Sequence, residues 1–201
     1  MVLTPKPLSW IQPGVFAGSL APLVVIATRG LAGRLGANPI STALNQFGLV
    51  ALILLLASLS CTPLRILFGW TWPLRVRKTL GLFGFFYACL HLFTYAALDQ
   101  ALALRVIFDD VTKRPFILIG FTAFCLLIPL AVTSNAWGIR RLGKNWQRLH
   151  RLAYAIGILG VVHFTMRMKS DVTQPLVYGG VLAALLGVRI IAVVSKSRSQ
   201  I

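Results

Sequence analysis

Three histidines are the residues whose type and position point most clearly to chemistry: His91, His150 and His163. Neutral imidazole is a common ligand of metal ions and of haem iron. Each histidine lies inside or at the edge of a long apolar stretch, where an ionisable side chain is costly and usually functional. A single histidine in such a stretch could instead be a hydrogen-bonded packing residue, but three of them on two stretches favour a binding site.

The depth of each histidine indicates which two can face one another. At about 1.5 Å per residue, His91 lies about 17 Å along a helix that begins near Leu80. On a helix that begins near Trp146, His150 lies at roughly 6 Å and His163 at roughly 25 Å. We therefore predict that His91 and His163 are the two axial ligands of a haem iron, with His150 as a possible further ligand. A haem held by two imidazoles has no open iron position, so it would carry electrons.

The same spacing limits the number of haems. His150 and His163 are 13 residues apart, about 20 Å along a helix, an interval that suits two stacked haems. A second haem would need a histidine 13 or 14 residues before His91, but those positions hold Lys78 and Arg77. Because arginine offers no neutral nitrogen ligand, we predict one haem. The chain has no C-x-x-C-H motif, so this haem would be of the b type, without thioether links.

The elements that must position these side chains are membrane helices. Of the 201 residues, 57% are hydrophobic and 12% are charged, against roughly 25% charged residues in a typical soluble domain. Six stretches approach the roughly 20 apolar residues that a spanning helix needs. They are approximately residues 10–28, 44–61, 80–98, 115–133, 149–166 and 175–194. We predict an all-α integral membrane six-helix bundle, a single domain over residues 1–201, in which Pro63 stops the second helix.

The charged residues indicate how the bundle is oriented. The chain has 20 Lys and Arg residues but only 4 acidic ones, and its basic residues form short clusters between apolar stretches. This distribution is typical of a membrane protein and argues against nucleic acid as a partner. If both termini are cytoplasmic, the cytoplasmic segments, with Lys6, hold 13 basic residues, and the outer segments, with Lys169, hold 7. The positive-inside rule therefore predicts cytoplasmic N and C termini.

Two runs of residues around the histidines resemble a known family, the MsrQ (YedZ) haem-binding subunits of bacterial methionine sulfoxide reductase systems. The matching residues are Arg77 to Leu82, Tyr87, Leu90, His91 and Tyr95 in the third stretch, Thr112 to Pro115 before the fourth, and Leu142 to Lys144, Trp146, Leu149, His150, Leu152, Tyr154 and His163 in the fifth. The likeness extends over nearly the whole chain in length and in helix count. That family belongs to the ferric-reductase-like transmembrane proteins, which supports the predicted bundle.

The resemblance implies a role and partners. Electrons would come from the quinone pool or a cytosolic flavin reductase and leave to MsrP, a periplasmic molybdopterin enzyme that reduces methionine sulfoxide. The chain would then be an electron-transfer subunit in the bacterial inner membrane, with the substrate-reducing site on its partner. FMN is associated with the family, and a quinone is a possible second cofactor.

Several basic residues could hold the anionic parts of these cofactors. Arg77, Lys78, Arg148 and Arg151 lie at the predicted cytoplasmic edge and could bind an FMN phosphate. Arg167 follows His163 by four residues, hence on roughly the same helix face, and could pair with a haem propionate. The alternative interpretation is that the first four residues only reflect the positive-inside rule and that Arg167 is an interfacial cap. Tyr87 and Tyr95, four residues on either side of His91, could pack on the porphyrin or fill the bundle.

Two other functions fit the same residues. The chain could be a stand-alone ferric reductase that passes electrons to external iron. It could also be a proton-coupled transporter in which the histidines relay protons, although no acidic residue falls within a predicted span to partner them.

Overall fold

The computed structural model describes residues 10–168 and 170–198, and these residues form helices with no strand among them. The elements are α1 (Ile11–Leu31), α2 (Pro39–Phe68), α3 (Pro73–Phe93), the π-helical turn η1 (Thr94–Asp99), α4 (Leu104–Lys113), α5 (Pro115–Val132), α6 (Ala136–Leu142), α7 (Lys144–His150), α8 (Leu152–Arg167) and α9 (Thr173–Arg198). Within the described residues, six segments are long and apolar enough to span a membrane. The all-α, six-span architecture is thus confirmed. Lys6 and Lys169 lie outside the described residues.

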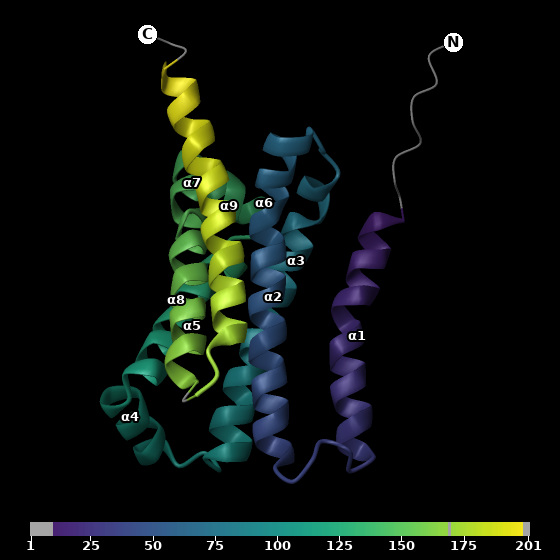
Figure 1. Cartoon of the computed structure of the whole chain (residues 1–201), viewed down its shortest axis with the longest axis vertical. Coiled ribbons are helices and arrows are strands. Elements are labelled where there is room, and N and C mark those ends of the chain that lie inside the picture. The colour runs from purple at the N-terminus through teal and green to yellow at the C-terminus, as the bar shows by residue number, and fades with distance from the viewer. Residues whose placement is uncertain (1–9, 169, 199–201) are drawn as a thin grey trace.

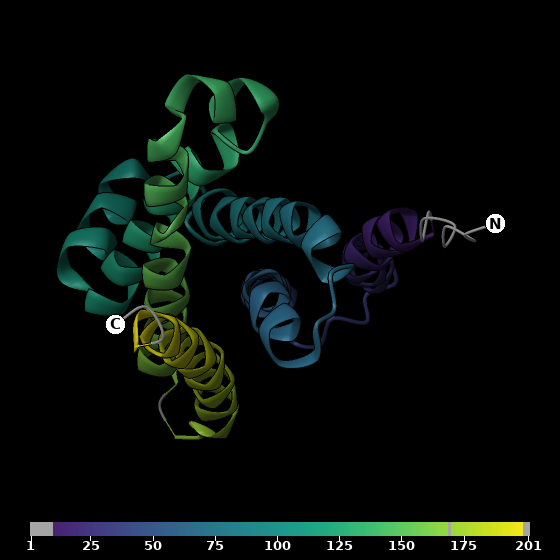
Figure 2. The ribbon, with the colours of Figure 1, turned by 90° about the horizontal axis from the view of Figure 1, so that it is seen from above.

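The six spans run along the long axis of the molecule (Figure 1). The beginning of α1 and the end of α9 lie at one end of the bundle, together with α6 and α7, and we call this the α7 end. Helix α4 and the α1–α2 connection lie at the opposite end, the α4 end. Seen from above, α1 lies to one side of the other spans (Figure 2), and it packs mainly on α3.

Two apolar clusters hold the bundle together. In one, Leu52, Leu56 and Leu59 of α2 pack against Leu182 of α9. The other joins α5 to Ile156 of α8. Large apolar side chains on the outside, among them Ile190 and Val193 of α9, stay exposed, as expected of a surface that meets lipid instead of water.

Helix α2 does not stop at Pro63, so that prediction was wrong; the helix continues to Phe68 and ends at Gly69, whose φ is 70°. Proline has no N–H to donate to the carbonyl four residues earlier, which here is Leu59. Nη2 of Arg189 on α9 donates to the Leu59 carbonyl over 2.8 Å and so replaces the missing bond. Membrane helices tolerate an internal proline when a neighbouring group satisfies the freed carbonyl in this way.

The Tyr87 hydroxyl of α3 makes two hydrogen bonds to the backbone of helix α1. Leu23 follows Pro22 in α1, and its N–H donates to the Tyr87 hydroxyl over 2.9 Å. The same hydroxyl donates to the Ser19 carbonyl over 2.7 Å. Tyr87 is fully buried, so α3 satisfies two backbone groups of α1 inside the membrane-spanning region.

The fifth span consists of two helices, α7 and α8, which meet at Arg151. His150 therefore lies on α7 and His163 on α8. Helix α9 begins after Asp171, which accepts a hydrogen bond from the backbone N–H of Thr173 over 2.9 Å. The hydroxyl and the N–H of Thr173 lower the pKa of the exposed Asp171 carboxyl.

Candidate functional site

His91 of α3 and His163 of α8 lie side by side. Their ring centroids are 6.1 Å apart and their planes are nearly perpendicular, at 85°. Both side chains line a cavity of about 480 Å³ between α2, α3, α5 and α8, a volume within the range of roughly 300–1,000 Å³ that is usual for cofactor sites.

Each of the two imidazoles is fixed by a backbone carbonyl. Nδ1 of His91 lies 2.8 Å from the Leu44 carbonyl oxygen of α2, and Nδ1 of His163 lies 2.6 Å from the Phe116 carbonyl oxygen of α5. A carbonyl only accepts hydrogen bonds, so Nδ1 must carry the proton in both rings. Nε2 then keeps its lone pair in the neutral form, the state in which imidazole binds a metal.

This pair has the dimensions of a two-imidazole metal site. Two metal–nitrogen bonds of about 2.0–2.1 Å, with the nitrogen-to-centre distance of each ring, place the ring centroids about 6 Å apart. Across the described residues, no group of three or more His, Cys, Asp or Glu side chains could hold an ion by itself. Two imidazoles facing one cavity therefore fit a haem, which supplies the other iron ligands itself.

The cavity is apolar along its walls and polar at its α4 end. Leu52, Leu127 and Ile156 are among the residues that line it deeper in the bundle. Arg167, near the α4 end, also lines the cavity, and its guanidinium donates to Oδ1 of Asn45. A cationic group is thus held at the polar end of the cavity, where it could meet the carboxylates of a haem.

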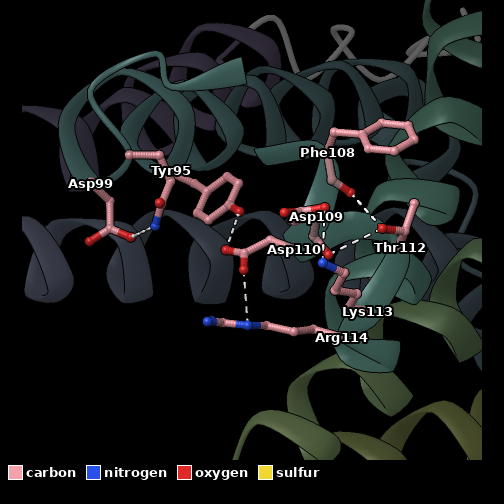
Figure 3. Close-up of polar contacts among 9 residues, drawn as sticks. Tyr95, Asp99, Phe108, Asp109, Asp110, Thr112, Lys113 and Arg114 are labelled. Carbon is pink, nitrogen blue, oxygen red and sulfur yellow. Dashed lines mark hydrogen bonds and ion pairs between the residues drawn. The ribbon is translucent and has the colours of Figure 1, made fainter. Parts of the chain in front are cut away.

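A second polar cluster, around Asp110 of α4, contacts two residues of the cavity wall, Tyr95 and Arg114; Figure 3 shows its contacts. Asp110 of α4 is 6% exposed, accepts a hydrogen bond from the Tyr95 hydroxyl over 2.8 Å and pairs with Arg114 over 2.9 Å. Tyr95 and Arg114 both line the cavity, whereas Tyr87 does not. Of the two tyrosines that flank His91, Tyr95 therefore contributes to the site and Tyr87 holds α1.

His150 has different surroundings. The Trp146 ring stacks on it, with centroids 3.9 Å apart, and its Nε2 lies 3.1 Å from the Thr133 hydroxyl. That hydroxyl donates to the Pro129 carbonyl over 2.6 Å, so it accepts from His150, and the proton of His150 belongs on Nε2. His150 is not among the residues that line the cavity of His91 and His163, and it has the opposite tautomer.

The four basic residues considered for a phosphate lie at the α7 end of the bundle. Arg77 of α3 is partly buried, and its backbone carbonyl accepts a hydrogen bond from Ser58. Lys78, Arg148 and Arg151 are exposed. Over the described part of the chain, no ion pair or hydrogen bond involves the side chains of these four residues, so their cofactor role stays a prediction.

Sequence reasoning missed some residues of the site. Asn45 lines the cavity although it lies far from any histidine in the chain, and Arg114, part of the family-like run Thr112 to Pro115, lines it without having been assigned a role. Gly48 and Gly120 lie directly against His91 and His163, respectively. The pairing of α2 with α3 and of α5 with α8 brings these residues together, and only the folded bundle reveals it.

Comparisons with known proteins identify the family of the chain. Residues 42–161 match the family described as "Ferric reductase like transmembrane component". A protein of Rhodospirillum rubrum named "Protein-methionine-sulfoxide reductase heme-binding subunit MsrQ" is 48% identical over 186 residues, which cover 92% of this chain and 89% of the relative. The protein of the same name in Deinococcus radiodurans is 47% identical and covers 92% of both chains. In Herminiimonas arsenicoxydans the identity is 44%, over 93% of this chain and 87% of the relative. No solved structure matches the chain.

Proposed function

The chain belongs to the MsrQ family of ferric-reductase-like transmembrane proteins, and on this premise we propose that it carries electrons across the bilayer on a b-type haem. The chain would be one domain over residues 1–201 and the electron-transfer subunit of a methionine sulfoxide reductase system. The substrate would be reduced on a separate catalytic subunit.

The observation that carries this proposal is the pair formed by His91 and His163. Their centroids are 6.1 Å apart, both line one cavity, and both have Nδ1 bonded to a carbonyl. A haem held by two imidazoles supplies one-electron exchange at an iron without an open position. Asn45 orients Arg167 toward the cavity, where its positive charge would meet a haem propionate. His150 supports the proposal of a single haem, because its Nε2 carries a proton that it donates to the Thr133 hydroxyl, so this nitrogen has no free lone pair for iron.

The direction of transfer follows from the predicted orientation. With both termini in the cytoplasm, the α4 end and its cavity face the periplasm of a bacterium, and the α7 end faces the cytoplasm of the inner membrane. The haem would then lie on the side of the periplasmic molybdopterin subunit, MsrP. The reductant, the quinone pool or a cytosolic flavin reductase, would deliver its electrons at the α7 end.

A second carrier would shorten the transfer from the α7 end. His163 lies 19 residues beyond Lys144, roughly 28 Å at helical rise, which is long for a single electron-transfer step. An FMN or a quinone near His150 would divide that distance. Arg77, Lys78, Arg148 and Arg151 lie at the same end, and their positive charges could hold an FMN phosphate.

Optical spectra and cofactor quantitation of purified protein test the proposal. We expect one haem per chain with a low-spin spectrum in the wild type and loss of that spectrum in His91→Ala and in His163→Ala. A low-spin spectrum that survives in His91→Ala would refute the ligand assignment. Haem-free wild-type protein with pH-dependent flux in proteoliposomes would favour the transporter, and efficient reduction of soluble ferric chelates without a periplasmic partner would favour the stand-alone ferric reductase.

A further inference from the structure

We propose that Gly48 and Gly120 are positioning residues of the haem site, each leaving open the backbone carbonyl that fixes one ligand imidazole. This inference rests on the proposed function, because it concerns how His91 and His163 are presented to the haem. It assigns a role to two residues that carry no functional group of their own.

The two histidines are held in the same way by different helix pairs. In one half of the site, the Leu44 carbonyl of α2 bonds His91 of α3, 47 residues later. In the other half, the Phe116 carbonyl of α5 bonds His163 of α8, also 47 residues later. A glycine follows each of these carbonyl residues by four positions, Gly48 in α2 and Gly120 in α5.

A glycine is required at that spacing for a geometric reason. In an α-helix the Cα–Cβ bond tilts toward the N-terminus, so the side chain of residue i+4 lies over the turn that contains residue i. A side chain at position 48 would therefore cover the Leu44 carbonyl, and one at position 120 would cover the Phe116 carbonyl. Without a side chain, each carbonyl can accept from the imidazole in addition to its own helical hydrogen bond, since it has two lone pairs.

The distances show how little room there is. A Cβ at position 48 would lie 2.8 Å from Nδ1 and 3.0 Å from Cε1 of His91. A Cβ at position 120 would lie 2.6 Å from Nδ1, 2.7 Å from Cε1 and 3.1 Å from Cγ of His163. These are contacts with a rigid ring that is tied to the carbonyl beside it, so the ring cannot move aside and keep its hydrogen bond. The crowding is greater at Gly120.

Other glycines of the chain serve as references. Within residues 10–168 and 170–198, Gly48 and Gly120 are the ones whose added Cβ would meet an imidazole. At Gly157 a Cβ would lie 3.2 Å from the Leu59 side chain and 3.3 Å from the Leu182 side chain, apolar contacts outside the cavity. At Gly180 no atom lies within 4 Å of the added Cβ. Gly180→Ala is therefore a neutral control, and Gly157→Ala is a control for disturbed packing away from the two imidazoles.

The test compares Gly48→Ala, Gly120→Ala, Gly157→Ala and Gly180→Ala as purified protein. The measurements are haem per polypeptide and the electron paramagnetic resonance (EPR) spectrum of the ferric state, which reports the relative orientation of the two imidazole planes. We expect Gly180→Ala to match the wild type. Gly157→Ala should be less stable, but the haem it binds should give the wild-type signal. Gly48→Ala and Gly120→Ala should lose haem several-fold, more so for Gly120→Ala, and their remaining haem should give an altered signal.

A double variant keeps the proposal testable if Gly120→Ala folds poorly. In His163→Ala the ring that a methyl group at position 120 would meet is gone, so adding Gly120→Ala to His163→Ala should cost no further thermal stability. The same stability loss with and without the ring would overturn the proposal, as would wild-type haem content and EPR signal in both Gly48→Ala and Gly120→Ala. Wild-type protein without haem would instead refute the proposed function, so the two failures are distinguishable.

Discussion

Replacing Tyr87 by phenylalanine tests how α1 is held in the bundle. The change removes one hydroxyl and keeps a ring that is fully buried. That hydroxyl satisfies the N–H of Leu23 over 2.9 Å and the carbonyl of Ser19 over 2.7 Å, two backbone groups beside Pro22 of α1. The Leu23 N–H and the Ser19 carbonyl are four residues apart in α1 and can still bond one another, so the loss is that of two hydrogen bonds, each worth about 0.5–1.5 kcal/mol. We expect the free energy of unfolding to fall by about 1–3 kcal/mol.

The assay is reversible unfolding of the purified, haem-containing protein in detergent micelles by titration with sodium dodecyl sulfate, followed by circular dichroism. Tyr178→Phe is the matched control, because Tyr178 packs on Phe164 and its hydroxyl makes no hydrogen bond within the described residues. It should change the unfolding free energy by less than about 0.5 kcal/mol. The haem spectrum of Tyr87→Phe should stay unchanged, since Tyr87 does not line the cavity. Equal stability of the two variants would refute the reasoning, and an altered haem spectrum would place Tyr87 at the porphyrin.

Three further predictions concern the polar residues. His150→Ala should keep the haem between His91 and His163 but slow its reduction from the cytoplasmic side, as measured by stopped-flow spectroscopy; loss of all haem would make His150 a ligand. Arg167→Gln should lower the midpoint potential of the haem by tens of millivolts in a redox titration, because a nearby positive charge favours the reduced state; an unchanged or higher potential would place the Arg167 charge away from the haem. Asp110→Asn should destabilise the protein by about 1–3 kcal/mol and increase proteolysis near α4, because Tyr95 and Arg114 lose a charged acceptor; wild-type stability would show that this ion pair is dispensable.

The long apolar spans could be predicted because lipid imposes a length and a composition that the sequence displays directly. Pro63 shows where this reasoning fails. A proline is expected to end a helix, but the sequence does not reveal that Arg189, 126 residues later, donates to the freed Leu59 carbonyl. The short helix α4 was also missed, since its ten residues are too few and too polar to register as a span.

The histidines could be found by type, and depth alone indicated that His91 and His163 lie at compatible levels. Their tautomers could not be predicted, because the carbonyls of Leu44 and Phe116 that fix them come from other helices. Gly48 was equally hidden, because a glycine in a membrane helix has many possible reasons and the ring beside it becomes visible only when α2 and α3 are paired.

Chemical rescue of one missing ligand is the sharpest test of the proposed haem site. In His163→Gly the space of the imidazole ring becomes vacant while His91 stays in place. We predict that the low-spin haem spectrum disappears in this variant and returns when free imidazole is added. A low-spin spectrum that is present in His163→Gly without imidazole would contradict the assignment of His91 and His163 as the two residues that together hold the haem.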